Sequence, residues 1–317
     1  MRQLSGLLST LTICLVAMLA WGCANVTFLN TDDVISGLSD LILRPQDSCE
    51  KMRERFGLTY MPLAETPTDI GMDYEEHWIP VTEDVSLRVW YIPANLDRGT
   101  ILYSCGNTGE MACYLYSALL LTDNGWSVVI YDYQGHGGSD GQPSLSTLSD
   151  DLEAVLEWTR AWTAREQVTL MGMSLGSIPS IAVAVGHPDA VNGVILDSPV
   201  ALGAQVNRFS FAIGGQTEWL IDQLDPQLLS DTLIGWMQQP LLVFMHDSDT
   251  LTTPGTVQLL YDRAAGPKQI VHFPELGHAR GQFVDTDEYI YHLEHFLNDI
   301  WSRVMEEQPY RALRRGL

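Results

Sequence analysis

The chain of 317 residues is poor in positive charge. It has 17 Lys and Arg residues against 40 Asp and Glu residues, so its formal net charge is −23. A charge of this size repels phosphate backbones and anionic lipid head groups, which argues against a nucleic-acid-binding protein. Only one long apolar run exists, near the N-terminus, which excludes a polytopic membrane protein. Hydrophobic residues still make up 46% of the chain, enough for a large buried core.

Cysteine is also scarce. Of the five cysteines, Cys14 and Cys23 lie in the N-terminal apolar region, which leaves Cys49, Cys105 and Cys113 for the body of the protein. No CxxC pair and no Cys/His spacing suggests a zinc site. Three cysteines allow at most one disulfide and one free thiol, and we expect buried reduced thiols rather than a disulfide.

The single apolar run has the features of an export signal. At about 1.5 Å per residue, the stretch from Leu7 to Trp21 spans about 22 Å, less than the bilayer core of about 30 Å. It ends in Gly22 and Cys23, and this ending resembles the lipobox of bacterial lipoproteins. We predict a signal peptide over residues 1–22 and acylation of Cys23, which would hold an exported protein at a membrane of the cell envelope. A plain signal peptide and an uncleaved anchor are the alternatives.

Beyond residue 74, short apolar segments alternate with helical patterns. The first two strand-like segments alternate in polarity, typical of an antiparallel edge hairpin, whereas the later ones are continuous and apolar, typical of parallel strands covered on both faces. The order predicts an α/β fold with a doubly wound, mostly parallel eight-stranded sheet. The expected strands are 75–81, 87–92, 99–104, 127–133, 167–173, 191–196, 240–245 and 269–273, and the expected helices are 112–122, 147–163, 175–185, 256–264 and 285–305.

Residues 74–305 are expected to form a single catalytic domain, which accounts for most of the chain. Residues 23–73 read as an N-terminal linker or extension with one amphipathic helix at 49–56, and residues 306–317 read as a C-terminal tail. The insertion at residues 199–238 is too long for a simple crossover and predicts a small helical cap. Its large apolar residues are Phe209, Phe211, Trp219 and Trp236.

The strongest local motif is Gly172-Met173-Ser174-Leu175-Gly176, a G-x-S-x-G that follows a predicted strand and precedes a predicted helix. The turn between them is tight and strains the serine backbone, so residues without side chains are needed on either side. This geometry lifts the Ser174 hydroxyl above the sheet, at a helix N-terminus that favours an oxyanion. Ser174 is therefore the candidate nucleophile.

A serine hydroxyl needs a base and a group that orients the base, and in this kind of fold both follow the serine along the chain. Asp249 follows the strand 240–245, at the edge of the sheet where catalytic groups gather, and His278 follows the strand 269–273. We favour Asp249 as the acid and His278 as the base. Asp247 and Asp197 remain alternatives for the acid, and His136 is the other histidine expected near the site.

An oxyanion hole requires backbone amides aimed at the developing negative charge. One is expected from Leu175, directly after the nucleophile. The second is expected from Asn107, in the glycine-rich loop Ser104–Gly109 that follows the strand 99–104.

These motifs resemble those of the α/β-hydrolase superfamily of serine hydrolases, over about residues 74–305. Residues 105–109 (CGNTG) resemble its His-Gly-Asn-x-Gly oxyanion loop with Cys105 in place of His, residues 132–139 (DYQGHGGS) resemble its Asp-Tyr-Arg-Gly-x-Gly-x-Ser stretch, and residues 172–176 resemble its nucleophile elbow. Asp249 with Pro254 resembles its acid loop, and Gly277-His278 resembles its terminal Gly-His. The subgroup resembled is that of small-capped, often membrane-associated hydrolases.

The resemblance implies an α/β-hydrolase fold and two-step acyl transfer to water, with no metal or organic cofactor. The expected substrate is a small-molecule or lipid-like acyl ester or thioester, because these leaving groups need less help than an amine, and the apolar cap residues favour an acyl or aryl group. A peptidase or amidase, an acyltransferase and a non-catalytic envelope lipoprotein are the alternatives.

Overall fold

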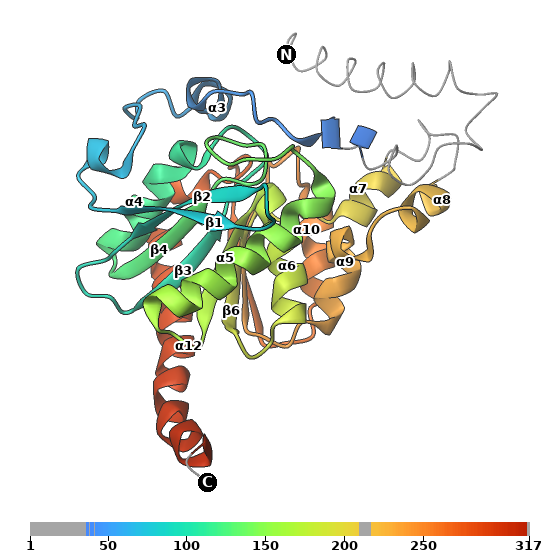
Figure 1. The fold of residues 1–317 in the computed structure, drawn as a ribbon. Helices are drawn as coiled ribbons and strands as arrows, with labels where there is room; N and C mark the ends of the chain where they lie inside the picture. Colours follow the sequence, from blue (N-terminus) through green and yellow to red (C-terminus); the bar gives the residue numbers. More distant parts are fainter. Residues whose placement is uncertain (1–35, 38, 41, 209–216, 316–317) are drawn as a thin grey trace, which may run out of the picture.

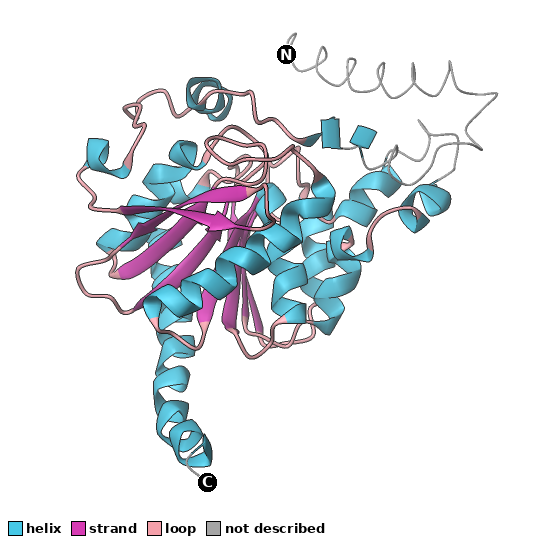
Figure 2. Ribbon diagram, viewed as in Figure 1, coloured by secondary structure: helices cyan, strands magenta, loops and turns pink. Residues whose placement is uncertain are grey.

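The computed structural model describes residues 36–315 except 38, 41 and 209–216. Helices cover both faces of a single eight-stranded sheet: α4 and α12 lie on one face, and α5, α6 and α10 lie on the other (Figures 1 and 2). The strand order is β1-β2-β4-β3-β5-β6-β7-β8. This is the α/β-hydrolase fold, as the sequence predicted.

All eight predicted strands form, and their ends differ from the prediction by one or two residues. β1 pairs with β2 and β2 pairs with β4 in antiparallel fashion, whereas the strands from β3 to β8 are parallel. Strands β3 to β7 are buried along their whole length, but β8 is an edge strand that exposes Gln269 and His272. The strands are β1 Glu75–Pro80, β2 Ser86–Ile92, β3 Gly99–Ser104, β4 Trp126–Tyr131, β5 Val168–Met173, β6 Val191–Asp197, β7 Leu241–His246 and β8 Lys268–Phe273.

The predicted helices are present as well. The last one is longer than expected: it continues through most of the predicted tail to Arg315 and projects from the body (Figure 1). Within the described ranges, no helix is both long and apolar enough to cross a membrane. The helices are α3 Cys49–Phe56, α4 Leu115–Asp123, α5 Leu148–Thr163, α6 Ser177–Gly186, α7 Leu202–Arg208, α8 Thr217–Asp222, α9 Ser230–Leu233, α10 Pro254–Arg263, α11 Gly281–Val284 and α12 Thr286–Arg315.

The insertion between β6 and β7 is helical, as predicted, with α7, α8 and α9 in its described part. Phe209 and Phe211 lie outside the described residues. Trp236 is 72% exposed and Trp219 is 36% exposed. These two indole rings therefore lie at the surface of the insertion, contrary to the expectation that they would contribute to an apolar substrate site.

The N-terminal region contradicts two expectations. Cys49, the first residue of α3, forms a disulfide with Cys113, which lies in the short 3₁₀ helix Met111–Tyr114 after β3; only Cys105 is a free, buried thiol in the described chain. The expectation of reduced thiols was wrong for this pair because the fold brings together two residues 64 positions apart. The region is also more than a linker, since Leu43, Met52 and Leu58 are buried against the domain.

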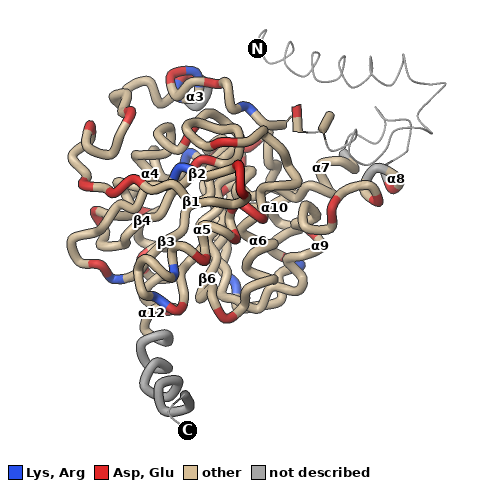
Figure 3. The backbone as a smooth tube through the Cα atoms, in the orientation of Figure 1, with Lys and Arg blue, Asp and Glu red and all other residues tan. Residues whose placement is uncertain are grey.

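Acidic side chains outnumber basic ones over the described body and are spread along many elements rather than gathered in one patch (Figure 3). The charge imbalance of the sequence is therefore a property of the whole surface and marks no particular site.

Candidate active site

The G-x-S-x-G motif forms the tight turn that its spacing predicts. Ser174 has φ of +50°, in the left-handed region, and stands between β5 and α6. A Cβ atom on Gly176 would lie 2.1 Å from the carbonyl oxygen of Ser104, and one on Gly172 would lie 2.5 Å from the carbonyl oxygen of Gly176. Only glycine fits either position, so the two glycines allow the strained turn that raises Ser174 at the end of the sheet.

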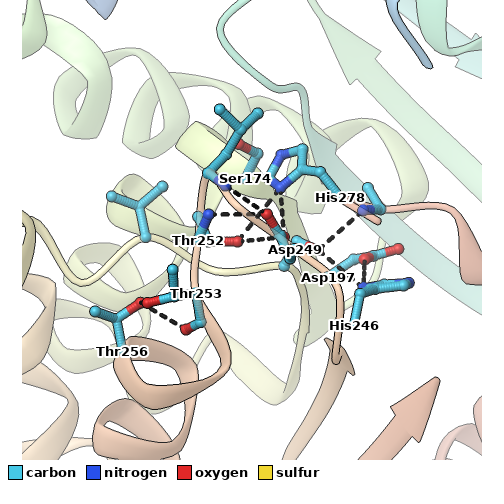
Figure 4. Close-up of polar contacts among 12 residues, drawn as sticks. Ser174, Asp197, His246, Asp249, Thr252, Thr253, Thr256 and His278 are labelled. Atoms are coloured by element: carbon cyan, nitrogen blue, oxygen red, sulfur yellow. Dashed lines mark hydrogen bonds and ion pairs between the residues drawn. The ribbon is translucent and has the colours of Figure 1, made fainter. Parts of the chain in front are cut away.

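Asp249 and His278 come together at the carboxyl ends of β7 and β8. The Nδ1 atom of His278 lies 2.7 Å from Oδ2 of Asp249. The hydroxyl of Thr252 donates to the same carboxylate oxygen at 2.7 Å. Figure 4 shows the His278 ring between Ser174 and Asp249. Because Nδ1 meets the carboxylate, Nε2 is the ring nitrogen that can act as a base towards Ser174.

The surroundings of Asp249 keep it ionised. Burial raises the pKa of this carboxyl group, but the hydrogen bond and charge of His278, with hydrogen bonds from Thr252 and Leu251, outweigh that effect and hold its pKa below the ordinary value. An ionised, oriented carboxylate is what a catalytic histidine needs, because it fixes the ring tautomer and stabilises the imidazolium ion.

The rival residues do not share this arrangement. Asp247 lies 3.3 Å from His272, both of them partly exposed at the sheet edge. Asp197 is fully buried and accepts a hydrogen bond from Tyr289 at 3.0 Å. His136 is buried, its Nδ1 contacts the carbonyl oxygen of Gln134, and its Nε2 has no protein partner. Among the candidates from the sequence, the geometry therefore favours Asp249 and His278.

The loop after β3 lies next to the serine. A Cβ atom on Gly106 would be 2.8 Å from the Tyr114 hydroxyl and 3.8 Å from Cβ of Ser174. The hydroxyl of Tyr133 donates to the carbonyl oxygen of Cys105 at 2.9 Å, which fixes the backbone at that point. Burial raises the pKa of the Cys105 thiol well above its ordinary value, so this thiol stays protonated at physiological pH.

A pocket that opens to solvent connects these elements, and its space, with the solvent at its mouth included, is about 480 Å³. Ser174, His278 and Asn107 line it, and so do Met52, Leu58 and Phe283, none of which the sequence singled out. The amphipathic pattern of 49–56 is the one signal that could have pointed to Met52. No described residue of the 199–238 insertion is among those lining this pocket.

A second cluster of the same residue types lies behind the pocket. Ser198 follows β6 with φ of +50°, and its Oγ accepts a hydrogen bond from the amide of Ala279 at 3.0 Å. His246 contacts Ser198 Oγ through Nδ1 at 2.9 Å and accepts from the amide of Gly281 through Nε2 at 2.9 Å. Ser198 and His246 thus hold the backbone on the C-terminal side of His278. Sequence reasoning missed both, although each ends a buried strand, as Ser174 and Asp249 do.

In the described part of the chain, no group of three or more His, Cys, Asp or Glu residues is placed to hold a metal ion.

Residues 97–237 match the family described as serine aminopeptidase, S33. An uncharacterized protein of Mycobacterium tuberculosis is 27% identical over 225 residues, covering 70% of this chain and 78% of that protein. The α/β hydrolase domain-containing protein WAV2 of Arabidopsis thaliana is 26% identical over 235 residues, covering 70% of this chain and 76% of that protein.

Solved structures share the fold. The esterase Pf2001 of Pyrococcus furiosus aligns with a TM-score of 0.61 at 21% identity, covering 74% of this chain and 96% of the esterase. The esterase EaEST of Exiguobacterium antarcticum aligns with a TM-score of 0.54 at 16% identity, covering 71% of this chain and all of that esterase. The fold is that of the α/β hydrolases.

Proposed function

We propose that the protein is a serine hydrolase that cleaves carboxylic ester or thioester bonds through an acyl-enzyme on Ser174. One observation carries the proposal: Ser174, on its strained turn, and His278 line the same pocket, and Nδ1 of His278 lies 2.7 Å from the buried Asp249 carboxylate. A nucleophile, a base and an oriented acid in this order form the Ser-His-Asp arrangement of acyl transfer.

The reaction proceeds in two steps. Ser174 Oγ attacks the ester carbonyl carbon while Nε2 of His278 takes the hydroxyl proton, and the amides of Asn107 and Leu175 bind the oxyanion. When the tetrahedral intermediate collapses, the bond to the leaving group breaks and His278 gives it the proton. A water molecule then attacks the acyl-enzyme with His278 again as the base, which releases the acid and restores Ser174. Asp249 stays ionised throughout and stabilises the imidazolium ion.

The rival function is peptidase or amidase activity, which the name of the matched family favours. The structural neighbours Pf2001 and EaEST are esterases instead. Parallel assays of p-nitrophenyl acyl esters and aminoacyl p-nitroanilides separate the two. We expect the esters to be the better substrates, because an alcohol or thiol leaves more readily than an amine.

The decisive experiment is labelling with a fluorophosphonate, which reacts with activated serines. We expect the wild type to be labelled and Ser174→Ala and His278→Ala to remain unlabelled, with Ser146→Ala, an exposed serine, as the matched control. A folded wild-type protein that takes no label would overturn the proposed function and favour a non-catalytic binding protein of the same fold.

We also propose that the protein is exported and attached to an envelope membrane through a lipid on Cys23. The Cys49–Cys113 disulfide supports export, because disulfides persist in oxidising compartments. Cys23 itself lies outside the described residues. Mass spectrometry of the mature N-terminus tests the proposal, since an unmodified Cys23 would exclude it.

A further inference from the structure

The segment of residues 42–64, here called the N-terminal wall, is bonded directly to the candidate oxyanion loop. The amide of Arg44 donates to the carbonyl oxygen of Asn107 at 2.8 Å, and the amide of Gly109 donates to the carbonyl oxygen of Arg44 at 2.9 Å. The Asn107 side chain in turn donates to the carbonyl oxygen of Ile42 at 2.8 Å. The N-terminal wall is therefore hydrogen-bonded to both the backbone and the side chain of Asn107.

Two further features fix this wall against the body. The Cys49–Cys113 disulfide ties the start of α3 to the 3₁₀ helix that follows the oxyanion loop. Gly57, with φ of +69°, ends α3 and reverses the chain, so that Leu58 packs back beneath the helix with 3% of its surface exposed. Met52, on α3, is 7% exposed.

A second cavity adjoins the catalytic pocket along the N-terminal wall; it is open to solvent, and its space, with that solvent included, is about 360 Å³. The two cavities share four lining residues: Met52, Leu58, Cys113 and Phe283. These four side chains therefore lie at the boundary where the two cavities adjoin. A methionine side chain is flexible and adapts to what it contacts, so Met52 is suited to a boundary that a bound chain must pass.

The lining of the second cavity is suited to hydrocarbon. Met61, Pro62, Leu63 and Ala64 contribute apolar surface, and no carboxylate is among its described lining residues. The one cation among them, Arg53, donates to the carbonyl oxygens of Leu58 and Thr59. The Arg53 guanidinium group is therefore hydrogen-bonded to the backbone of the N-terminal wall itself.

We propose that the cavity behind Met52 and Leu58 is the subsite for the acyl chain, so that the enzyme prefers esters of medium or long aliphatic acids. This rests on the proposed function. The leaving group must lie beside His278, which returns the proton to it, whereas the second cavity adjoins residues that follow the oxyanion loop and neither His278 nor Arg280 lines it. The acyl chain is therefore the part of the substrate directed towards the cavity.

The first test is a chain-length profile with the full protein, its disulfide intact, on p-nitrophenyl esters from acetate to myristate. Each methylene buried in an apolar site improves binding by about two- to fourfold, so kcat/KM should rise steadily with chain length until the cavity is full. A flat wild-type profile, or one that falls from acetate onwards, would overturn the proposal.

Variants at this boundary provide the second test. Leu58→Trp should lower kcat/KM for decanoate at least tenfold more than it lowers kcat/KM for acetate, whereas Met52→Ala should shift the optimum to longer chains. Leu96→Trp is the matched control, because Leu96 is 75% exposed and lines neither cavity. A loss that is equal at all chain lengths indicates a structural role and contradicts the subsite.

Removing the Cys49–Cys113 disulfide provides the third test. Cys49→Ala/Cys113→Ala should flatten the chain-length profile, and dithiothreitol should do the same to the wild type but not to the variant. If both treatments leave the chain-length profile unchanged, the N-terminal wall forms the subsite without the disulfide, and the disulfide has no part in the proposal.

Binding without turnover separates this inference from the proposed function. Dodecanoate should bind the wild type and Ser174→Ala in calorimetry and bind Leu58→Trp at least tenfold more weakly. If the wild type takes no fluorophosphonate yet binds dodecanoate in this way, the hydrolase proposal fails and the apolar subsite stands. If it is labelled but dodecanoate binds all variants equally or not at all, the subsite proposal fails.

A series of alkyl acetates tests which part of the substrate enters the cavity. A rate that depends on the length of the alcohol, and not on that of the acyl group, would place the leaving group in the cavity and overturn the assignment.

Discussion

Two clusters of serine, histidine and aspartate stand at adjacent strand ends of this protein, and we propose a catalytic role for only one of them. The first is Ser174, His278 and Asp249; the second is Ser198, His246 and Asp197. Both serines have φ of +50° and follow the neighbouring parallel strands β5 and β6. The two clusters thus have the same residue types and similar positions at strand ends. What distinguishes them is the orientation and the burial of their side chains.

Orientation is the first difference. In the second cluster, Nε2 of His246 already accepts a hydrogen bond from the amide of Gly281, so Nδ1 carries the ring proton and donates it to Ser198. A histidine that donates to a serine cannot remove its proton. In the first cluster, Nδ1 of His278 faces the carboxylate, which leaves the basic nitrogen for Ser174.

Burial is the second difference. Asp197 is fully buried, which raises its pKa to about 7; the hydrogen bond from Tyr289 opposes this shift and the charge of Asp249 adds to it. Burial also lowers the pKa of His246 to about 4, so that ring is neutral at physiological pH. The pKa of Asp249 is instead held low by its partners. The second cluster is therefore suited to holding the His278 loop rather than to chemistry.

Replacement of the two serines gives the largest expected contrast. Ser174→Ala should lower kcat on p-nitrophenyl acetate by about 10⁴-fold or more, because it removes the nucleophile. Ser198→Ala should cost about tenfold or less and keep fluorophosphonate labelling, since Ser198 acts only through the backbone next to His278. Loss of labelling in a folded Ser198→Ala would break the comparison.

The two buried acids should differ almost as much. Asp249→Asn should lower kcat by about 10³- to 10⁴-fold, because the amide leaves the His278 ring in the wrong tautomer. Asp197→Asn should cost less than about tenfold in the same assay. Asp247→Asn, at the partly exposed edge, is the control and should change kcat by less than about twofold; a large loss there would move the acid assignment to Asp247.

His246→Ala tests the supporting role of the second cluster. It removes the acceptor for the buried Gly281 amide, so the free energy of unfolding should fall by about 1–3 kcal/mol in urea denaturation. We also expect kcat to fall about tenfold with little change in KM, since the position of the base is affected more than substrate binding. Wild-type kcat in this variant would show that the Gly281 contact does not position His278.

The last contrast concerns the pH dependence of stability and involves no change in kcat. The folded-state pKa of Asp197 is raised from 3.8 to about 7, so the stability it contributes is full below about pH 4 and is lost as pH rises towards 7. Asp197→Asn removes this loss. Its free energy of unfolding, relative to wild type, should therefore increase by a few kcal/mol between about pH 4 and pH 8. A difference that does not vary with pH would contradict the raised pKa.

Most of the fold could be predicted from the sequence, because buried parallel strands such as β5 and β6 are largely apolar runs. Ser174, Asp249 and His278 could be proposed for a similarly local reason, since each follows a predicted strand. The partners that hold them could not. Ser198 and His246 also follow strands, yet no local pattern shows which histidine faces the pocket.

The N-terminal wall illustrates the same limit for the substrate. The aromatic composition of the insertion at 199–238 predicted an apolar part of the substrate site. Met52 and Leu58, by contrast, lie in a segment that the sequence analysis interpreted as a linker or extension. Their place beside Ser174 depends on the Cys49–Cys113 disulfide and on the pairing of Arg44 with Thr108, contacts between residues 64 positions apart in each case. Such contacts leave no periodic trace in the chain.

Local chemistry alone therefore specified the strands, the strained Ser174 turn with its two obligatory glycines, and the residue types available for acyl transfer, because each depends on neighbours a few positions away. Tertiary packing decided which serine and histidine meet at the pocket, which carboxyl group has a lowered pKa, and which N-terminal segment lines the pocket. Those outcomes depend on burial and on distances across the sheet, and both exist only once the chain has folded.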